Sequence, residues 1–490
     1  MHTSFIARIL LCLIVVFALL ARFVVGSQAV AQRATLPANE PYSLSYAAGG
    51  HDARGNFLGG TELMNLAAFE GKLYAGIGYW MDVARFRSAP FDPRAGAGYG
   101  MGRADVFQQS ADPPSGPQIL VLDSKNSQWR QEMVFDQRNY GGGFLYNRLS
   151  AMELIQFHRY DAAGNVLGPA AQMLVVGLDG RGGTVYTRRL PGNWEDTRFP
   201  TPIPIRSLAV HYDRTDKTEK LFAGPGGEQD QTVDRPIYSG VYDPSAPGRI
   251  RWDPTPEHLG FQGRVMSMVE CGGSLFAAAR PSILRRNDAK KSWEIIYTYP
   301  VTDPLDLSII SSGFRGLTCI DGPDGKKALL TGFEGTSGDI LRVDPQTGSA
   351  VVELHTRQFL TQQWGSPPAK RDIIPGYNDV PLVRSAPEIR LFGILSFSPN
   401  ANQISAAWFL SRAAGNPPRY EPHEVGPPPN WPYARSDTGL WSVRSIAVSP
   451  FPEDQGQILY LGGYDGHFKP DHNTAWLYRV GMDTALAGYK

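Results

Sequence analysis

One short motif recurs seven times along this 490-residue chain and constrains the fold more than any other feature. Its clearest copy opens with Arg264, runs through apolar residues to Met268, passes Gly272-Gly273 and enters a second apolar stretch at Leu275. This pattern predicts two short strands joined by a tight glycine turn. The first copy opens with a carboxylate, Glu62, and the other five open with arginine: Arg148, Arg206, Arg315, Arg390 and Arg444. Seven copies of one unit predict a repeat protein.

Most of the copies lie 51–58 residues apart, which leaves room for a four-stranded unit with its turns. The unit that begins at Arg315 shows four predicted strands, over 315–320, 328–331, 339–343 and 350–354. The last unit shows three, and we expect the segment 42–47 to supply its fourth strand and remove an exposed sheet edge. Deleting residues 40–48 should then lower the melting temperature strongly. The sixth unit, with strands expected at 391–397 and 404–410, is the least regular.

Several units share features outside the motif. A tryptophan follows the third strand at Trp129, Trp252 and Trp293, where it can bury a large apolar area between neighbouring units. Glycine pairs follow second strands at Gly226-Gly227 and Gly462-Gly463. Through these features, residues 40–482 resemble degenerate kelch-like or bacterial-neuraminidase (BNR, Asp-box) repeats of the β-propeller superfamily. The resemblance implies an all-β propeller of seven four-stranded blades, or six with one defective unit, closed into a ring by the N-terminal strand.

The N-terminus has the pattern of a secretory signal. Arg8 precedes an apolar run over 9–21, and Ala29-Val30-Ala31 fits a small-x-small cleavage site. We therefore expect a signal peptide at 1–31, a short mobile segment at 32–40, one propeller domain at 41–482 and a C-terminal tail at 483–490. The protein is expected to be exported, to a periplasm or outside the cell, with an uncleaved N-terminal anchor as the alternative. After cleavage no stable membrane span is expected.

The mature chain would keep two cysteines, Cys271 and Cys319. Export permits a disulfide between them, but we expect two buried thiols. The 47 Lys and Arg residues balance the 47 Asp and Glu residues, so no basic field exists to attract nucleic acid. The sequence contains no G-x-S-x-G, H-E-x-x-H or G-x-x-x-x-G-K-[ST] motif. It therefore indicates neither a reaction class nor a cofactor.

The repeated arginines are the main candidates for a ligand site. In propellers the first strand of each unit lines a central channel, so the resemblance places these side chains together at one mouth. Guanidinium groups bind carboxylate, phosphate and sulfate groups, often bidentately. We therefore predict an anion site with Glu62 as a ligand-orienting or acid/base residue, lined by Arg148, Arg206, Arg264, Arg315, Arg390 and Arg444. The alternative is that each arginine is structural and pairs with a carboxylate or carbonyl of a neighbouring unit.

A second polar group lies in the last unit and comprises Asp465, His467, Asp471 and His472. These residue types could hold zinc or calcium, but their spacing matches no known ligand pattern, and turn chemistry explains the Asp and Gly residues. We expect an ordinary loop, with a metal site as the alternative and His467 as a further acid/base candidate. Aromatic residues of long loops, Trp364 and Tyr377 among them, could stack on sugar rings or pack against the protein.

These features predict, first, a binding or scaffold protein whose channel mouth takes an anionic ligand, either an acidic saccharide or a partner protein. The second hypothesis is a hydrolase or lyase that acts on an anionic carbohydrate or a lactone at the same mouth. The third is an interaction propeller whose arginines are purely structural.

Overall fold

The structure is a computed structural model, and it describes residues 42–78, 116–135, 148–180, 182–226, 236–258, 260, 264–301, 313–368, 373–395, 407–425, 440–465 and 475–486. All of these belong to one compact unit, Asn39–Lys490; the other unit, Met1–Ala38, lies outside the described residues. In the described part of the chain, no helix is both long and apolar enough to cross a membrane.

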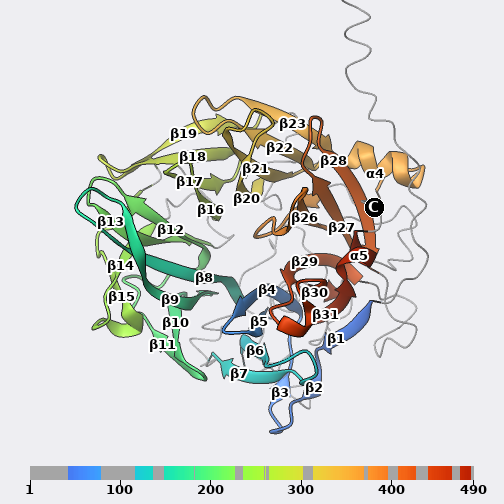
Figure 1. Cartoon of the computed structure of the whole chain (residues 1–490), viewed down its shortest axis with the longest axis horizontal. Helices are drawn as coiled ribbons and strands as arrows, with labels where there is room; N and C mark the ends of the chain where they lie inside the picture. The colour runs from blue at the N-terminus through green and yellow to red at the C-terminus, as the bar shows by residue number, and fades with distance from the viewer. Residues whose placement is uncertain are drawn as a thin grey trace, which may run out of the picture. The chain divides into compact units, whose positions relative to one another are not determined.

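Five antiparallel sheets, each of four consecutive strands, confirm the all-β prediction (Figure 1). The first sheet contains β4 (Glu62–Phe69), β5 (Lys72–Gly78), β6 (Gln118–Leu122) and β7 (Arg130–Val134). The second contains β8 (Arg148–Tyr160), β9 (Val166–Asp179), β10 (Val185–Leu190) and β11 (Asn193–Asp196). The third contains β12 (Ile205–Asp213), β13 (Thr218–Pro225), β14 (Tyr238–Tyr242) and β15 (Ile250–Trp252). The next two contain β16 (Val265–Cys271), β17 (Ser274–Ala279), β18 (Ser282–Asn287) and β19 (Ser292–Thr298), and β20 (Gly313–Asp321), β21 (Lys327–Glu334), β22 (Asp339–Val343) and β23 (Ala350–His355). The repeat motif opens the first strand of each sheet.

The last unit forms the predicted sheet from both ends of the described chain. Its strands are β29 (Leu440–Val448), β30 (Ile458–Asp465) and β31 (Ala475–Gly481). The N-terminal strand β1 (Ser43–Ala47) pairs antiparallel with β31, with Ser43 opposite Arg479 and Ala47 opposite Trp476. The prediction that the segment 42–47 completes the last sheet is therefore confirmed.

The sixth unit differs from the prediction. The strand expected first, β26 (Glu388–Leu395), runs antiparallel to β29, and β27 (Ala407–Ala413) and β28 (Arg419–Val425) follow on one side. Two short strands, β24 (Ile374–Pro375) and β25 (Leu382–Ser385), pair with β26 along its other edge. The first strand of this unit is thus an interrupted one. Its break falls at residues 376–381, hereafter the strap.

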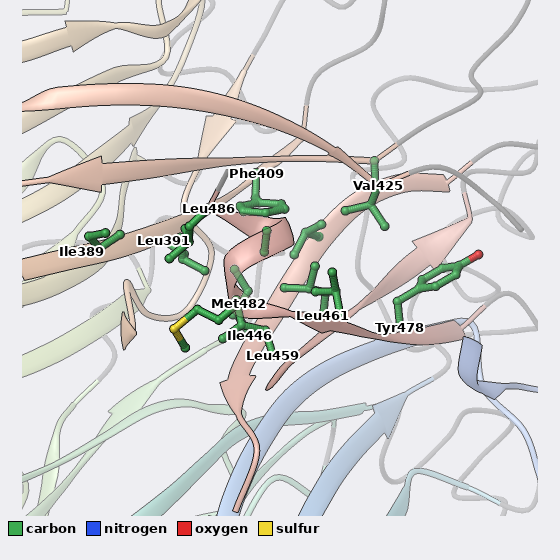
Figure 2. Close-up of a cluster of buried hydrophobic side chains, with 14 of the residues drawn as sticks. Ile389, Leu391, Phe409, Val425, Ile446, Leu459, Leu461, Tyr478, Met482 and Leu486 are labelled. Carbon is green, nitrogen blue, oxygen red and sulfur yellow. The ribbon is translucent and has the colours of Figure 1, made fainter. Parts of the chain in front are cut away.

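The large core clusters lie between neighbouring units. In the described part of the chain there are seven: six join the first unit to the second and so on to the last, and the seventh joins the last unit to the first. Figure 2 shows the cluster between the sixth and last units, where Leu391 and Phe409 meet Ile446 and Leu461. The predicted tryptophans Trp129, Trp252 and Trp293 are all buried in such clusters.

Short elements complete the described fold. They are β2 (Gly50–His51), β3 (Phe57–Leu58), the helices α4 (Thr356–Trp364) and α5 (Met482–Ala485), and two 3-10 turns over Pro247–Arg249 and Pro452–Asp454.

Cys271 and Cys319 form a disulfide with a Cα–Cα distance of 5.4 Å, so the expectation of two free thiols is corrected. Both residues lie on first strands, β16 and β20, that pack side by side, which brings their Cα atoms within bonding range. The link closes a loop of 48 residues, for which chain entropy predicts a stabilisation of about 4 kcal/mol.

Candidate functional site

The first strands share an irregularity that decides where the arginines point. The register shifts near the start of β4, β8, β12, β16, β20 and β29. Such a bulge inserts an extra residue and re-aims the neighbouring side chains. Arg206 and Arg444 are themselves the extra residues, whereas Arg148, Arg264 and Arg315 lie before the shift. The arginines of the motif therefore do not occupy one equivalent position.

Five of the six arginines nevertheless gather in one place, hereafter the arginine cluster. Burial lowers the pKa of Arg206 well below its ordinary value, and the charges of four other guanidiniums lower it further: Arg148, Arg444, Arg315 and Arg264. All five side chains are buried, with 3–9% of each residue exposed. The charges of these five side chains therefore lie near one another, and whether they form an anion site stays a prediction.

Carboxylates neutralise three members of the cluster. Arg148 Nε donates to Asp179 Oδ2 at 2.7 Å, and Arg315 Nε donates to Glu334 Oε2 at 2.6 Å. In both pairs the carboxylate comes from the second strand of the same sheet. Arg148 and Arg315 thus have counter-ions, but these lie within the same unit, whereas the structural alternative expected partners from a neighbouring unit.

The third pair joins the last sheet to the first, since Arg444 Nη1 donates to Glu62 Oε2 at 2.5 Å. Glu62 has no exposed surface, so the geometry favours its alternative role as a counter-ion over contact with a ligand.

Arg206 differs from these three. Its Nη1 donates to the carbonyl oxygen of Ser150 at 3.0 Å, and its Nη2 donates to Asn378 Oδ1 at 2.5 Å. Both acceptors are uncharged. Within the described residues no carboxylate forms an ion pair with Arg206, and its buried Nε has no hydrogen-bond partner. Arg206 therefore adds to the cluster a positive charge that no described carboxylate neutralises. A buried charge without a counter-charge is costly.

The structure places Arg390 away from the cluster. Its Nε donates to Glu388, and its other nitrogens donate to Thr318 Oγ1 and to the carbonyl oxygens of Val380 and Cys319. Thr318 and Cys319 follow Arg315 on β20, toward the far end of that strand. Because β26 runs opposite to β29, the motif arginine of this unit lies at the other end, and it is removed from the predicted anion site.

Small polar residues, rather than the arginines, make most of the described links between first strands. Asn65 Nδ2 donates to the carbonyl oxygen of Leu149 at 2.8 Å, and Ser150 Oγ donates to that of Ile205. Ser207 Oγ donates to the Val265 carbonyl, and Ser267 Oγ accepts from the Leu317 N–H. A serine or asparagine shortly after the motif start was the sequence signal for these links.

Two carboxyl groups near the first strands were not singled out from the sequence. Glu153 lies on β8, five residues after Arg148, and Asp379 lies in the strap. Both are exposed to solvent, yet the surrounding protein desolvates them. This desolvation, together with the charge of Asp379, raises the pKa of Glu153 to about 8, and desolvation raises the pKa of Asp379 to about 6. Each group can therefore hold a proton near neutral pH.

The other predicted residues give no site in the described part of the chain. His467, Asp471 and His472 lie outside the described residues, as does the side chain of Asp465 at the end of β30. No group of three or more metal-ligating His, Cys, Asp or Glu residues occurs among the residues described. Trp364 packs against Trp408 with ring centroids 5.2 Å apart, and Tyr377 is buried against Arg315 and Arg444. The packing alternative therefore describes both aromatic residues.

No protein-family model and no curated protein matches this chain. Among solved structures, it is similar to the extracellular domain of a B. thetaiotaomicron protein described as a hybrid two-component system, at 11% identity and a TM-score of 0.46. That match covers 90% of this chain but only 40% of the other. It is also similar to a Penicillium chrysogenum alpha-L-arabinanase complexed with arabinobiose, at 11% identity and a TM-score of 0.40, over 92% of this chain and all of the other. At these values neither likeness carries an argument about function.

Proposed function

We propose that this chain is an exported β-propeller of seven blades, closed by β1, that binds an anionic ligand at the arginine cluster. Seven inter-sheet cores that lead from the first sheet back to itself support the closed ring. The broken strand β24–β25 supports a complete sixth blade, because it gives that unit four strand positions. Kelch-like or BNR-like membership is kept as the subfamily hypothesis.

One observation carries the ligand proposal. Arg206 is buried among four other guanidiniums, and its described partners are neutral oxygens. If Arg206 had only a structural role, a carboxylate partner would stabilise the fold more than neutral oxygens do, as Asp179 does for Arg148. An anion supplied from outside would provide the missing charge.

Thermal unfolding in the presence of candidate anions tests this proposal. A ligand that binds only the folded state stabilises it by about 2.7 kcal/mol at 100 times its dissociation constant. We expect an acidic saccharide to raise the melting temperature of the wild type and of Arg390→Met, whose arginine lies outside the cluster, but not that of Arg206→Met. Equal stabilisation of all three proteins would refute the site, and no stabilisation by any anion would favour a purely structural propeller.

A second function, hydrolysis or elimination on an anionic carbohydrate, is favoured by Glu153 and Asp379. A carboxyl group whose pKa lies near the working pH is suited to donate or accept a proton during bond cleavage. Here Glu153 replaces Glu62 as the acid/base candidate. Release of reducing ends from an acidic glycan by the wild type, and its loss in Glu153→Gln, would establish an enzyme. Binding without turnover would leave the protein a binder.

A further inference from the structure

The strap is held firmly over the arginine cluster. Gly376 N donates to the carbonyl oxygen of Gly393 at 2.7 Å, and its positive φ of 74° is one that glycine adopts without strain. The ring of the next residue, Tyr377, lies 5.0 Å from Arg444 Cζ and 5.5 Å from Arg315 Cζ, and its hydroxyl is hydrogen-bonded to Ser442 Oγ at 2.7 Å. These contacts fix the position of Asn378, which follows directly.

Asn378 links Arg206 to the first sheet. Its Oδ1 accepts from Arg206 Nη2, while its Nδ2 donates to the carbonyl oxygen of Met64 at 3.1 Å and to Asn65 Oδ1 at 2.8 Å. The carbonyl of Met64 can only accept, which sets the orientation of the Asn378 amide. Asn65 is fixed in turn, because its own Nδ2 donates to Leu149. A group that takes the place of this amide must therefore offer an acceptor to Arg206 and donors to the Met64 carbonyl oxygen and Asn65 Oδ1.

We infer that Asn378 is an internal stand-in for the ligand, and that the ligand which displaces it is a hydroxylated carboxylate such as a uronic acid unit. This inference rests on the proposed function. A carboxylate would supply the acceptor and the negative charge for Arg206, and sugar hydroxyls would donate to the Met64 carbonyl and Asn65 Oδ1. Asn378 is partly exposed and Arg206 is buried, so the arginine is approached from the side that the amide covers.

The partners of Asn378 also exclude other classes of ligand. Sulfate has only acceptor oxygens and would face the oxygens of Met64 and Asn65 without a donor, which is a repulsive arrangement. A neutral sugar has the donors but leaves the charge of Arg206 unmatched. The described donors and acceptors thus favour a sugar acid over both an inorganic oxoanion and a neutral saccharide.

Calorimetric titration at pH 7 with galacturonate oligomers, galactose oligomers and sodium sulfate tests this inference on four proteins: the wild type, Asn378→Gly, Asn378→Asp and Arg206→Met. We expect the galacturonate oligomers to bind the wild type, and to bind Asn378→Gly at least about tenfold more tightly, because the ligand no longer competes with an internal side chain. Asn378→Asp supplies its own carboxylate to Arg206 and should weaken binding at least about a hundredfold, as should Arg206→Met.

The outcomes separate the two proposals. Sulfate binding as tight as galacturonate binding would overturn the sugar-acid inference and leave the anion site standing. Absence of binding by any anion to both the wild type and Asn378→Gly would overturn both. Equal affinity of the wild type and Asn378→Asp for galacturonate would place the ligand elsewhere. Asn378→Ser replaces Asn378→Gly if the glycine variant does not fold, and a single cooperative thermal transition of Asn378→Asp checks that this variant is folded.

Discussion

Two buried arginines of this protein have opposite surroundings. Arg286 on β18 has a fully buried side chain that donates to Glu257, Asp213 and Asp288 at 2.7–2.9 Å. Burial alone would lower its pKa, but Glu257 and Asp213 raise it above the ordinary value. Arg206 is equally enclosed, yet burial and repulsion lower its pKa. Three carboxylates surround the Arg286 guanidinium, whereas the described partners of Arg206 are neutral oxygens.

The contrast separates a structural arginine from a candidate binding arginine. The network around Arg286 also includes His211, whose two ring nitrogens lie 2.9 Å from Glu270 and 3.0 Å from Asp288. It joins the third and fourth sheets and contains its own counter-charges. Around Arg286 the surrounding strands and loops supply carboxylates as counter-charges. Among the described residues no carboxylate does the same for Arg206, and this difference sets the two arginines apart.

The largest effect is expected from Arg286→Met. The change leaves the buried Asp213 and Glu257 without their guanidinium partner, with Lys220 still paired to Asp213, and should cost about 3–5 kcal/mol of unfolding free energy. Urea unfolding at pH 7 measures this loss. Arg285→Met is the matched control, because among the described residues Arg285 pairs with the exposed Glu294 and should change stability by about 1 kcal/mol or less. Equal losses in the two variants would contradict the assigned role of Arg286.

Glu153→Gln tests a second desolvated group, a carboxyl on the first strand β8. Glu153 has a raised pKa of about 8 in the folded protein against an ordinary value of 4.5, so its contribution is fully present below pH 4.5. As pH rises toward 8, the unfolded chain loses this proton first, and the wild type loses stability. The glutamine variant should lack that part of the decline. Melting temperatures from pH 4 to pH 9 measure it, and parallel profiles of the two proteins would contradict it.

Ser207→Ala tests a neutral link beside the cluster. The Ser207 hydroxyl donates to the Val265 carbonyl at 3.2 Å, and its loss removes one hydrogen bond from this buried residue. We expect about 1 kcal/mol less unfolding free energy, measured by urea denaturation. An unchanged value would mean that these links between first strands add little to stability.

The smallest effect on stability is expected from Arg206→Met, although this change should abolish anion binding. Methionine keeps the apolar contacts of the side chain and removes a charge that lacks a described counter-ion, so stability should stay within about 1 kcal/mol of the wild type. The same urea experiment compares it with Arg286→Met. A loss of 3 kcal/mol or more would make the two arginines alike and end the contrast between them.

Local patterns in the sequence predicted the parts of this fold that depend on local structure. The strands of the unit that begins at Arg315 and the pairing of the segment 42–47 followed from alternation, turns and a missing fourth strand. The direction of each arginine could not be predicted, because a bulge of one residue re-aims side chains without an evident sequence mark. The role of Asn378 was equally hidden, since its partner Asn65 lies 313 residues away. The broken first strand of the sixth unit, with β24 and β25 of two and four residues, is too short to give a periodic signal.

The pairing of β1 with β31 has a consequence for how the protein is made. Ser43 finds its partner only after Arg479 has been synthesised, so this sheet stays incomplete until then. Contacts between such distant residues form slowly, because a very long loop must close first. The last sheet is therefore expected to complete its pairing late in folding, after the sheets built from consecutive strands.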